Sequence, residues 1–232
     1  MEQHLMSPAV AVFNRATLHQ RENGALVLLG INSRVPSAPL HRSASRSAII
    51  WADLQEDPRS PTLLAVGYAD DTISIFNAVT GERLWNGSAM GTATGVLVRD
   101  MLVLASDSEV FIKCWALEGS THKSFPAANA VICRYGSHLC ACSVKGTKLH
   151  CTVTDIMSVN LDSRVLFEIP MQVGYPLSMV ADVMRDKRAY IRVICGNGIV
   201  VGHPGGISHV AGDYSERPLG WPVWSVALTS AL

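Results

Sequence analysis

One stretch in the first half of the chain alternates short apolar runs with polar turn residues. Residues 63–66 are a continuous apolar run, and Asp70-Asp71 follow it as turn formers. Residues 73–76 then carry isoleucine at every second position, a period that places one face of a strand in a core. Thr80-Gly81 predicts a second turn, since glycine readily adopts positive φ, before a strand that ends at Trp85.

The same order of strand, polar turn, strand and turn returns three more times. The recurrences start at Met101, His138 and Ala189, and their first turns fall at Asp107-Ser108, Lys145-Gly146 and Gly196 to Gly198. Phe76 and Trp115, which occupy matching positions, are 39 residues apart. A period of about 40 residues is typical of the four-stranded blades of β-propellers. The pattern therefore predicts an all-β propeller of antiparallel blades, each of which covers the apolar face of the next.

The two ends of the chain are predicted to share one blade. Residues 221–232 read as its opening strand, and residues 8–31 offer further strands around a turn at Glu22-Asn23-Gly24. Joining them would remove exposed strand edges. Counting this shared blade gives about five blades, which form a single domain spanning residues 1–232. The propeller is therefore expected to be degenerate or incomplete relative to larger propellers. The alternative is an open ring that a partner completes.

These residues resemble the WD-repeat family. Phe76 and Trp115 match the position of the tryptophan that ends the third strand of such repeats, and Asp70-Asp71 match the acidic hairpin turn. The sequence departs from the family because neither aromatic residue is followed by Asp and no Gly-His pair opens a blade. The hydrogen-bond network of well-kept repeats therefore cannot be assigned to this chain.

A narrower resemblance covers residues 47–85, with the sequence SAIIWADLQEDPRSPTLLAVGYADDTISIFNAVTGERLW. This run is similar to early blades of the WD-repeat subunits of the small-subunit processome, which matures ribosomal RNA. Later blades of the same subunits are similar to two further segments, Phe167 to Ile169 and residues 191–201. The resemblance implies ribosome biogenesis and pre-rRNA processing in the nucleolus as the context of the chain.

The balance of charge bears on partners. The formal net charge is zero, whereas dedicated nucleic-acid binders carry a basic excess that neutralises phosphate. The local exception is an insertion at about 33–47, which holds Arg34, Arg42 and Arg46 among serines and prolines. We expect a flexible, solvated segment, because such a composition cannot bury a core. The alternative is an arm that makes peripheral contact with RNA or with an acidic protein surface.

Six cysteines raise the question of disulfides or metal. The chain is not short and shows no signal peptide, so a disulfide framework is not expected. His138, Cys140, Cys142, His150 and Cys151 cluster in sequence, and zinc takes four such ligands. Their spacing is not the paired C-x-x-C of zinc knuckles, and free cysteine is a common core residue. We expect buried thiols, no metal and no cofactor.

Catalytic motifs are missing from the sequence. It has no G-x-S-x-G elbow, no phosphate-binding loop and no H-E-x-x-H. Residues 77–85, NAVTGERLW, also resemble the blade-ending motif of quinoprotein dehydrogenases. Those enzymes repeat the motif in several blades, whereas this chain has a single copy. The sequence therefore predicts a protein that is not an enzyme, with a quinoprotein-type enzyme as a weaker alternative.

The expected function is that of a scaffold for protein–protein interactions in a large assembly. Its partners would be other protein subunits, bound by the predicted turns, the basic insertion, and Trp221 and Trp224, since tryptophan is frequent in interface hot spots. Blade packing is the favoured role of these tryptophans, and partner binding is the alternative. We expect an intracellular protein of the nucleus or nucleolus that does not insert into membranes, with the cytoplasm as the alternative. The other context weighed is a trafficking, ciliary or other multisubunit complex.

Overall fold

The described part of the chain consists mainly of β-strands joined by short turns. The computed structural model describes residues 9–13, 16–21, 23–30, 38–39, 47–56, 61–89, 91–116, 123–183 and 189–211. In these residues the sole helix is a short 3₁₀ turn, η1, at Met171–Val173. The chain divides into two compact units, Met1–Met90 and Gly91–Leu232, and we describe each unit by itself.

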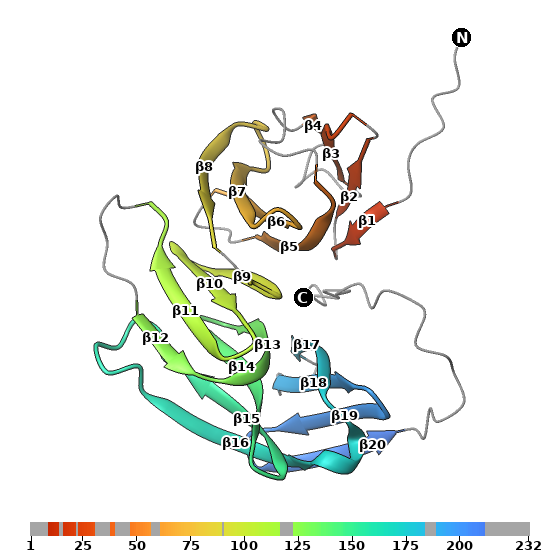
Figure 1. Ribbon diagram of the computed structural model, residues 1–232, viewed down its shortest axis with the longest axis vertical. Coiled ribbons are helices and arrows are strands. Elements are labelled where there is room, and N and C mark those ends of the chain that lie inside the picture. The colour runs from red at the N-terminus through yellow and green to blue at the C-terminus, as the bar shows by residue number, and fades with distance from the viewer. Residues whose placement is uncertain are drawn as a thin grey trace. The chain divides into compact units, whose positions relative to one another are not determined.

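The first unit contains two four-stranded sheets (Figure 1). The strands of the first sheet are β1 (Ala9–Val12), β2 (Ala16–Gln20), β3 (Leu26–Gly30) and β4 (Ala38–Pro39). The strands of the second sheet are β5 (Ile49–Gln55), β6 (Leu63–Tyr68), β7 (Thr72–Asn77) and β8 (Arg83–Ser88). One buried apolar cluster joins the two sheets, with Leu18 and Leu28 from the first and Leu64 and Phe76 from the second.

The second unit contains three four-stranded sheets, drawn in green to blue in Figure 1. The third sheet consists of β9 (Thr94–Val98), β10 (Met101–Ala105), β11 (Glu109–Cys114) and β12 (Lys123–Pro126). The fourth consists of β13 (Ala128–Tyr135), β14 (His138–Lys145), β15 (Lys148–Thr154) and β16 (Ser163–Pro170). The fifth consists of β17 (Pro176–Val183), β18 (Ala189–Cys195), β19 (Gly198–His203) and β20 (Gly206–Ala211).

Each sheet is a meander in which strands pair in sequence order. All neighbouring strands run antiparallel, as in the ladder of β14 and β15, where Cys142 lies opposite Cys151. Short turns between strands make this order the natural one. Five such four-stranded antiparallel blades confirm the predicted all-β propeller fold.

Within the second unit, neighbouring blades share their cores. One cluster joins the third and fourth blades and includes Val103 and Ile112 on one side and Leu139 on the other. Another joins the fourth and fifth blades and includes Phe167 on one side and Val193 on the other. Each blade therefore covers an apolar face of the next, as the repeat pattern predicts.

The structure also differs from the prediction in several places. The strands β2, β9, β13 and β17 were not anticipated. The first blade has four described strands, all from residues 9–39. The strand predicted at 221–232 lies outside the described residues. Within the predicted flexible insertion, Ala38–Pro39 form β4 and pair with β3.

Candidate functional site

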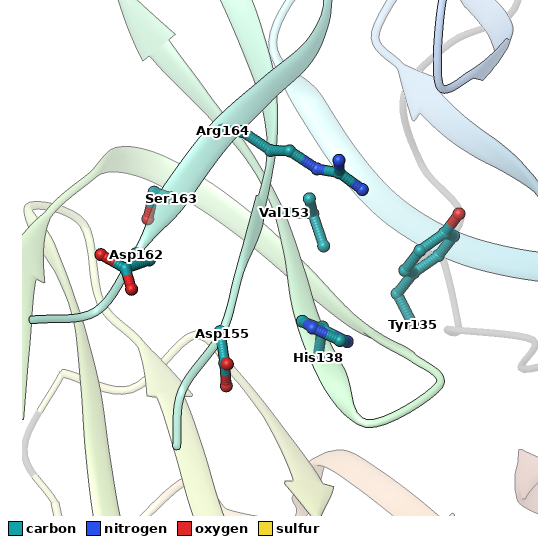
Figure 2. Close-up of a pocket in the computed structure, with 7 residues that line it drawn as sticks. All are labelled: Tyr135, His138, Val153, Asp155, Asp162, Ser163 and Arg164. Carbon is teal, nitrogen blue, oxygen red and sulfur yellow. The ribbon is translucent and has the colours of Figure 1, made fainter. Parts of the chain in front are cut away.

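The fourth blade carries a pocket at one end of its strands. Its volume is about 270 Å³. The ends of β13 and β15 and the starts of β14 and β16 supply its lining, which consists of Tyr135, His138, Val153, Asp155, Asp162, Ser163 and Arg164 (Figure 2). Val153 is buried at the base of this group, whereas the polar side chains are at least partly exposed. The pocket is therefore an accessible depression with several polar side chains around it, although most of its lining surface is apolar.

The loop of residues 155–162, between β15 and β16, borders this pocket and is held by its own hydrogen bonds. The Asp155 amide donates to the carbonyl of Asp162 at 2.9 Å and closes the base of the loop. The Met157 amide donates to Asp155 Oδ1 at 3.0 Å, and Ser158 Oγ donates to Asp162 Oδ2 at 2.8 Å. Short polar side chains that bond to nearby backbone in this way stabilise turns without glycine or proline.

Tertiary contacts fix the same loop against the third blade. Ile156 is fully buried in the core shared by the third and fourth blades, and Leu161 packs against that core. Lys123 of β12 donates from Nζ to the carbonyl of Ser158 at 2.8 Å. Leu161 has φ of 52°, which is strained for a branched side chain and is maintained here by these surroundings. The loop is thus a preorganised structure.

The tip of the loop presents apolar side chains to solvent. Met157 is 53% exposed and Val159 is 86% exposed, although their neighbour Ile156 is buried. Single exposed apolar residues are common on protein surfaces. Here two of them sit on a loop that is anchored at several points and lies beside a polar pocket. We call this loop, residues 155–162, together with the pocket, the β15–β16 rim.

One side of the pocket offers hydrogen-bond donors. Figure 2 shows Arg164 reaching from β16 across the pocket toward Tyr135, whereas His138 lies between Tyr135 and Asp155. Burial raises the pKa of Tyr135, an effect that the nearby Arg164 partly opposes, so the phenol keeps its proton at neutral pH. His138 Nδ1 is 3.3 Å from Ser137 Oγ. Among the described residues, nothing forms a hydrogen bond or ion pair with the Arg164 guanidinium.

The other side of the pocket is acidic. Asp155 and Asp162 lie away from the Tyr135 side in Figure 2. Each of them uses one carboxylate oxygen in the loop, toward the Met157 amide and the Ser158 hydroxyl respectively. The pocket therefore has an electrically divided lining, with a guanidinium on one side and two carboxylates on the other.

The cysteines form part of a core. Five of the six are buried thiols, Cys133, Cys140, Cys142, Cys151 and Cys195, as expected, whereas Cys114 is half-buried. Cys140 Sγ and Cys151 Sγ are 3.6 Å apart. Hydrogen bonding to the Cys133 and Cys151 thiols, followed by burial, raises the pKa of Cys140. His150 lies on the other face of β15, where Nε2 is 3.5 Å from Glu168 Oε1. In the described part of the chain, no three His, Cys, Asp or Glu side chains are placed to hold a metal ion.

His138, considered above as a possible zinc ligand, lines this pocket. The predicted partner-binding residues are not among its described lining residues. Arg34, Arg42, Arg46, Trp221 and Trp224 all lie outside the described residues. The predicted contact turns of the second unit, Asp107-Ser108, Lys145-Gly146 and Gly196 to Gly198, join the second and third strands of their blades, at the end opposite the pocket. The sequence pattern that could have predicted the loop of residues 155–162 is its alternation of Asp, Ser and Asn with apolar residues, without glycine or proline.

The structure contains no helix, among the residues it describes, that is long and apolar enough to cross a membrane. A search for related sequences gave no match to a protein-family model or to a curated protein.

Solved structures with the same fold do exist. A crystal structure of BBS1N in complex with ARL6DN, soaked with mercury, has a TM-score of 0.60 and 12% identity, covering 86% of this chain and 64% of that one. The corresponding crystal soaked with lead has a TM-score of 0.56 and 13% identity, covering 85% of this chain and 65% of that one. The β-propeller domain of Cps50 (Swd1) from Myceliophteria thermophila has a TM-score of 0.47 and 11% identity, covering 88% of this chain and 86% of that one.

These comparisons concern the fold alone, because the identities are low. The chain spans about 65% of the length of the BBS1N chain that it matches. What the comparisons and the geometry together establish is a propeller of five four-stranded blades with a structured rim on the fourth blade.

Proposed function

We propose that this chain is a non-enzymatic propeller scaffold that binds a protein partner through the β15–β16 rim. The observation that carries the proposal is the contrast within residues 156–159. Ile156 is fully buried, whereas Met157 and Val159 project into solvent from the same anchored loop.

The physical argument is that a partner can bind such a loop with little loss of conformational entropy. Burying an exposed apolar side chain of this size contributes roughly 1.5–3 kcal/mol. Ordering a flexible loop on binding would offset much of that gain. The loop is held in place before binding by the hydrogen bonds of Asp155 and Asp162 and by the contact from Lys123. The entropic cost of ordering the loop on binding is therefore reduced. Polar pocket residues next to the apolar tip form the polar surround typical of interfaces.

A protein with the same fold gives indirect support. BBS1N was crystallised in complex with another protein, ARL6DN. That complex is a property of BBS1N, and our proposal takes from it only that a propeller of this shape class is suited to binding proteins. For this chain, the absence of catalytic motifs from the sequence favours the same kind of role.

The wider context of the scaffold follows from sequence resemblance. We propose ribosome biogenesis in the nucleolus as the first context, on the similarity of residues 47–85 to processome subunits. A subunit of a trafficking, ciliary or other multisubunit complex is the second context. Peripheral RNA contact would depend on Arg34, Arg42 and Arg46, because the chain as a whole has no net charge.

Affinity purification of the tagged chain from its native cells tests the proposal. The expected result is recovery of a reproducible set of protein subunits, with pre-ribosomal particles if the first context is right. A matched variant, Met157→Ser with Val159→Ser, should lose at least one of these subunits. Recovery of the chain alone as a stable monomer, or unchanged recovery with the variant, would contradict the proposal.

A further inference from the structure

We propose that the pocket of the β15–β16 rim takes the carboxylate side chain of an acidic peptide segment in a partner protein. A neighbouring apolar side chain of the same segment packs on Met157 and Val159. This inference rests on the proposed function, because it assigns the chemistry of the partner to the same rim.

The first step is that the pocket has a donor, the Arg164 guanidinium, without an internal acceptor among the described residues. Arg164 lines the pocket, and among the described residues its guanidinium has no hydrogen-bond or ion-pair partner. Tyr135 lines the same side, and Arg164 is close enough to Tyr135 to influence its ionisation. A guanidinium presents several N–H groups in a planar fork that matches a carboxylate, and a phenol O–H can complete the set. The lining is therefore suited to an oxyanion.

The second step decides between a carboxylate and a phosphate. Asp155 and Asp162 line the opposite side of the pocket. At neutral pH a phosphate monoester carries close to two negative charges, and carboxylates nearby repel it. A single carboxylate carries half that charge, so Asp155 and Asp162 repel it less than they repel a phosphate, and it still matches the single charge of Arg164. The divided lining thus favours an Asp or Glu side chain, whose adjacent peptide N–H groups can donate to Asp155 or Asp162.

The third step concerns size and surroundings. The pocket volume of about 270 Å³ lies just below the range of small-molecule sites, about 300–1,000 Å³, and is open to solvent. It therefore accommodates part of a polypeptide better than a whole cofactor. Val153 gives an apolar contact within the pocket, and Met157 and Val159 extend apolar surface next to it. A carboxylate with an apolar neighbour in an extended peptide fits both surfaces together.

The experiment selects peptides from a random heptapeptide display library on the full chain and measures the selected sequences as fluorescent synthetic peptides. Binding is compared among the wild type, Arg164→Gln, Tyr135→Phe and Arg83→Gln. Arg83 is an exposed arginine on β8 in the first unit and serves as the matched control. For each peptide, versions with Gln or phosphoserine in place of the acidic residue are measured as well.

The expected result is enrichment of Asp or Glu beside an apolar residue. Arg164→Gln, like the Gln peptide, should weaken binding about tenfold or more, as expected for a charge-assisted hydrogen bond, whereas Arg83→Gln should have no effect. Tyr135→Phe should weaken binding by a smaller factor. Because Arg164 is exposed, its replacement leaves the fold intact.

The other outcomes overturn the inference in distinguishable ways. Tighter, Arg164-dependent binding of the phosphoserine peptide would show that the pocket prefers phosphate. Peptides that are insensitive to Arg164→Gln but are lost with Met157→Ser and Val159→Ser would overturn the carboxylate assignment and leave the proposed function standing. A library that yields no peptide dependent on either part of the rim would count against both.

Discussion

Phe167 of β16 lies directly against Gly202 of β19, at the junction of the fourth and fifth blades. A Cβ atom placed on Gly202 would be 2.4 Å from both Cε1 and Cζ of the phenyl ring, closer than such atoms approach in proteins. The ring itself is 5% exposed and belongs to the core that joins the two blades. The missing side chain at Gly202 is therefore part of how one blade covers the next.

Replacing Gly202 with alanine should destabilise the protein by about 1–3 kcal/mol, because the added methyl group must displace a buried ring. Denaturant unfolding measures this change. Gly196→Ala is the control, since its Cβ would meet only the Cα of Gly174, at 3.9 Å, and it should change stability by less than about 0.5 kcal/mol. Equal stabilities of the two variants would show that the junction is not close-packed.

Ile156→Ala should loosen the loop of residues 155–162 by removing its buried anchor. Truncating a buried isoleucine typically costs about 2–5 kcal/mol through lost burial and the cavity that remains. We expect faster amide exchange at residues 157–160, together with a lower denaturation midpoint. The adjacent Met157→Ala removes an exposed side chain and should change stability by less than about 0.5 kcal/mol. Similar exchange rates in the two variants would contradict the anchoring role of Ile156.

Alkaline pH should weaken the fold through its buried thiols. Burial raises the pKa of Cys195 to about 11 and raises the pKa of Cys142 as well, whereas an unfolded cysteine ionises near about 8.5. Above that value the unfolded state binds fewer protons than the folded state, so the free energy of unfolding falls as pH rises. For Cys195, its contribution is fully present below about pH 8.5 and is lost by about pH 11.

Guanidinium unfolding at several pH values between 8 and 11 measures this loss. Cys195→Ala should show a shallower fall of stability over this range than the wild type. Cys114→Ala keeps all five buried thiols and should follow the wild-type slope. If Cys195→Ala and the wild type lose stability in parallel, the Cys195 thiol has no part in the alkaline transition.

The strands that the sequence predicts well are those bounded by recognisable turns. β6 and β7 lie on either side of Asp70-Asp71, and β14 and β15 lie on either side of Lys145-Gly146. In each case a polar turn interrupts an apolar pattern, and glycine supplies the positive φ at Gly146. Hairpins of this kind are local structures, so their signals lie within a few residues of one another.

The first strands of several blades were missed because their signals are different. β13 carries small residues and a register shift between Ala128 and Val131, which breaks the two-residue period. β9 follows no strong turn signal and is buried over nearly its whole length, so it lacks a polar alternation. In the second unit, β13 packs against the first strands of both neighbouring blades, β9 and β17, and these contacts depend on residues far apart in sequence.

The rim was missed for a related reason. Asp155, Ser158 and Asp162 form turn hydrogen bonds, which short-range reasoning can anticipate. The burial of Ile156 and the contact from Lys123 come from the third blade and are tertiary. The same holds for the pocket, since Tyr135 and Arg164 are brought together only by the pairing of β13, β14, β15 and β16.

Site-specific photo-crosslinking in native cells tests the central claim most directly. A benzophenone amino acid at Val159, 86% exposed on the β15–β16 rim, should form a discrete crosslink to one partner protein. The same probe at Val79, an exposed valine in the turn between β7 and β8, provides the matched control and should form no such crosslink. If position 159 yields no crosslinked protein, or the same products as position 79, the rim is not the binding surface.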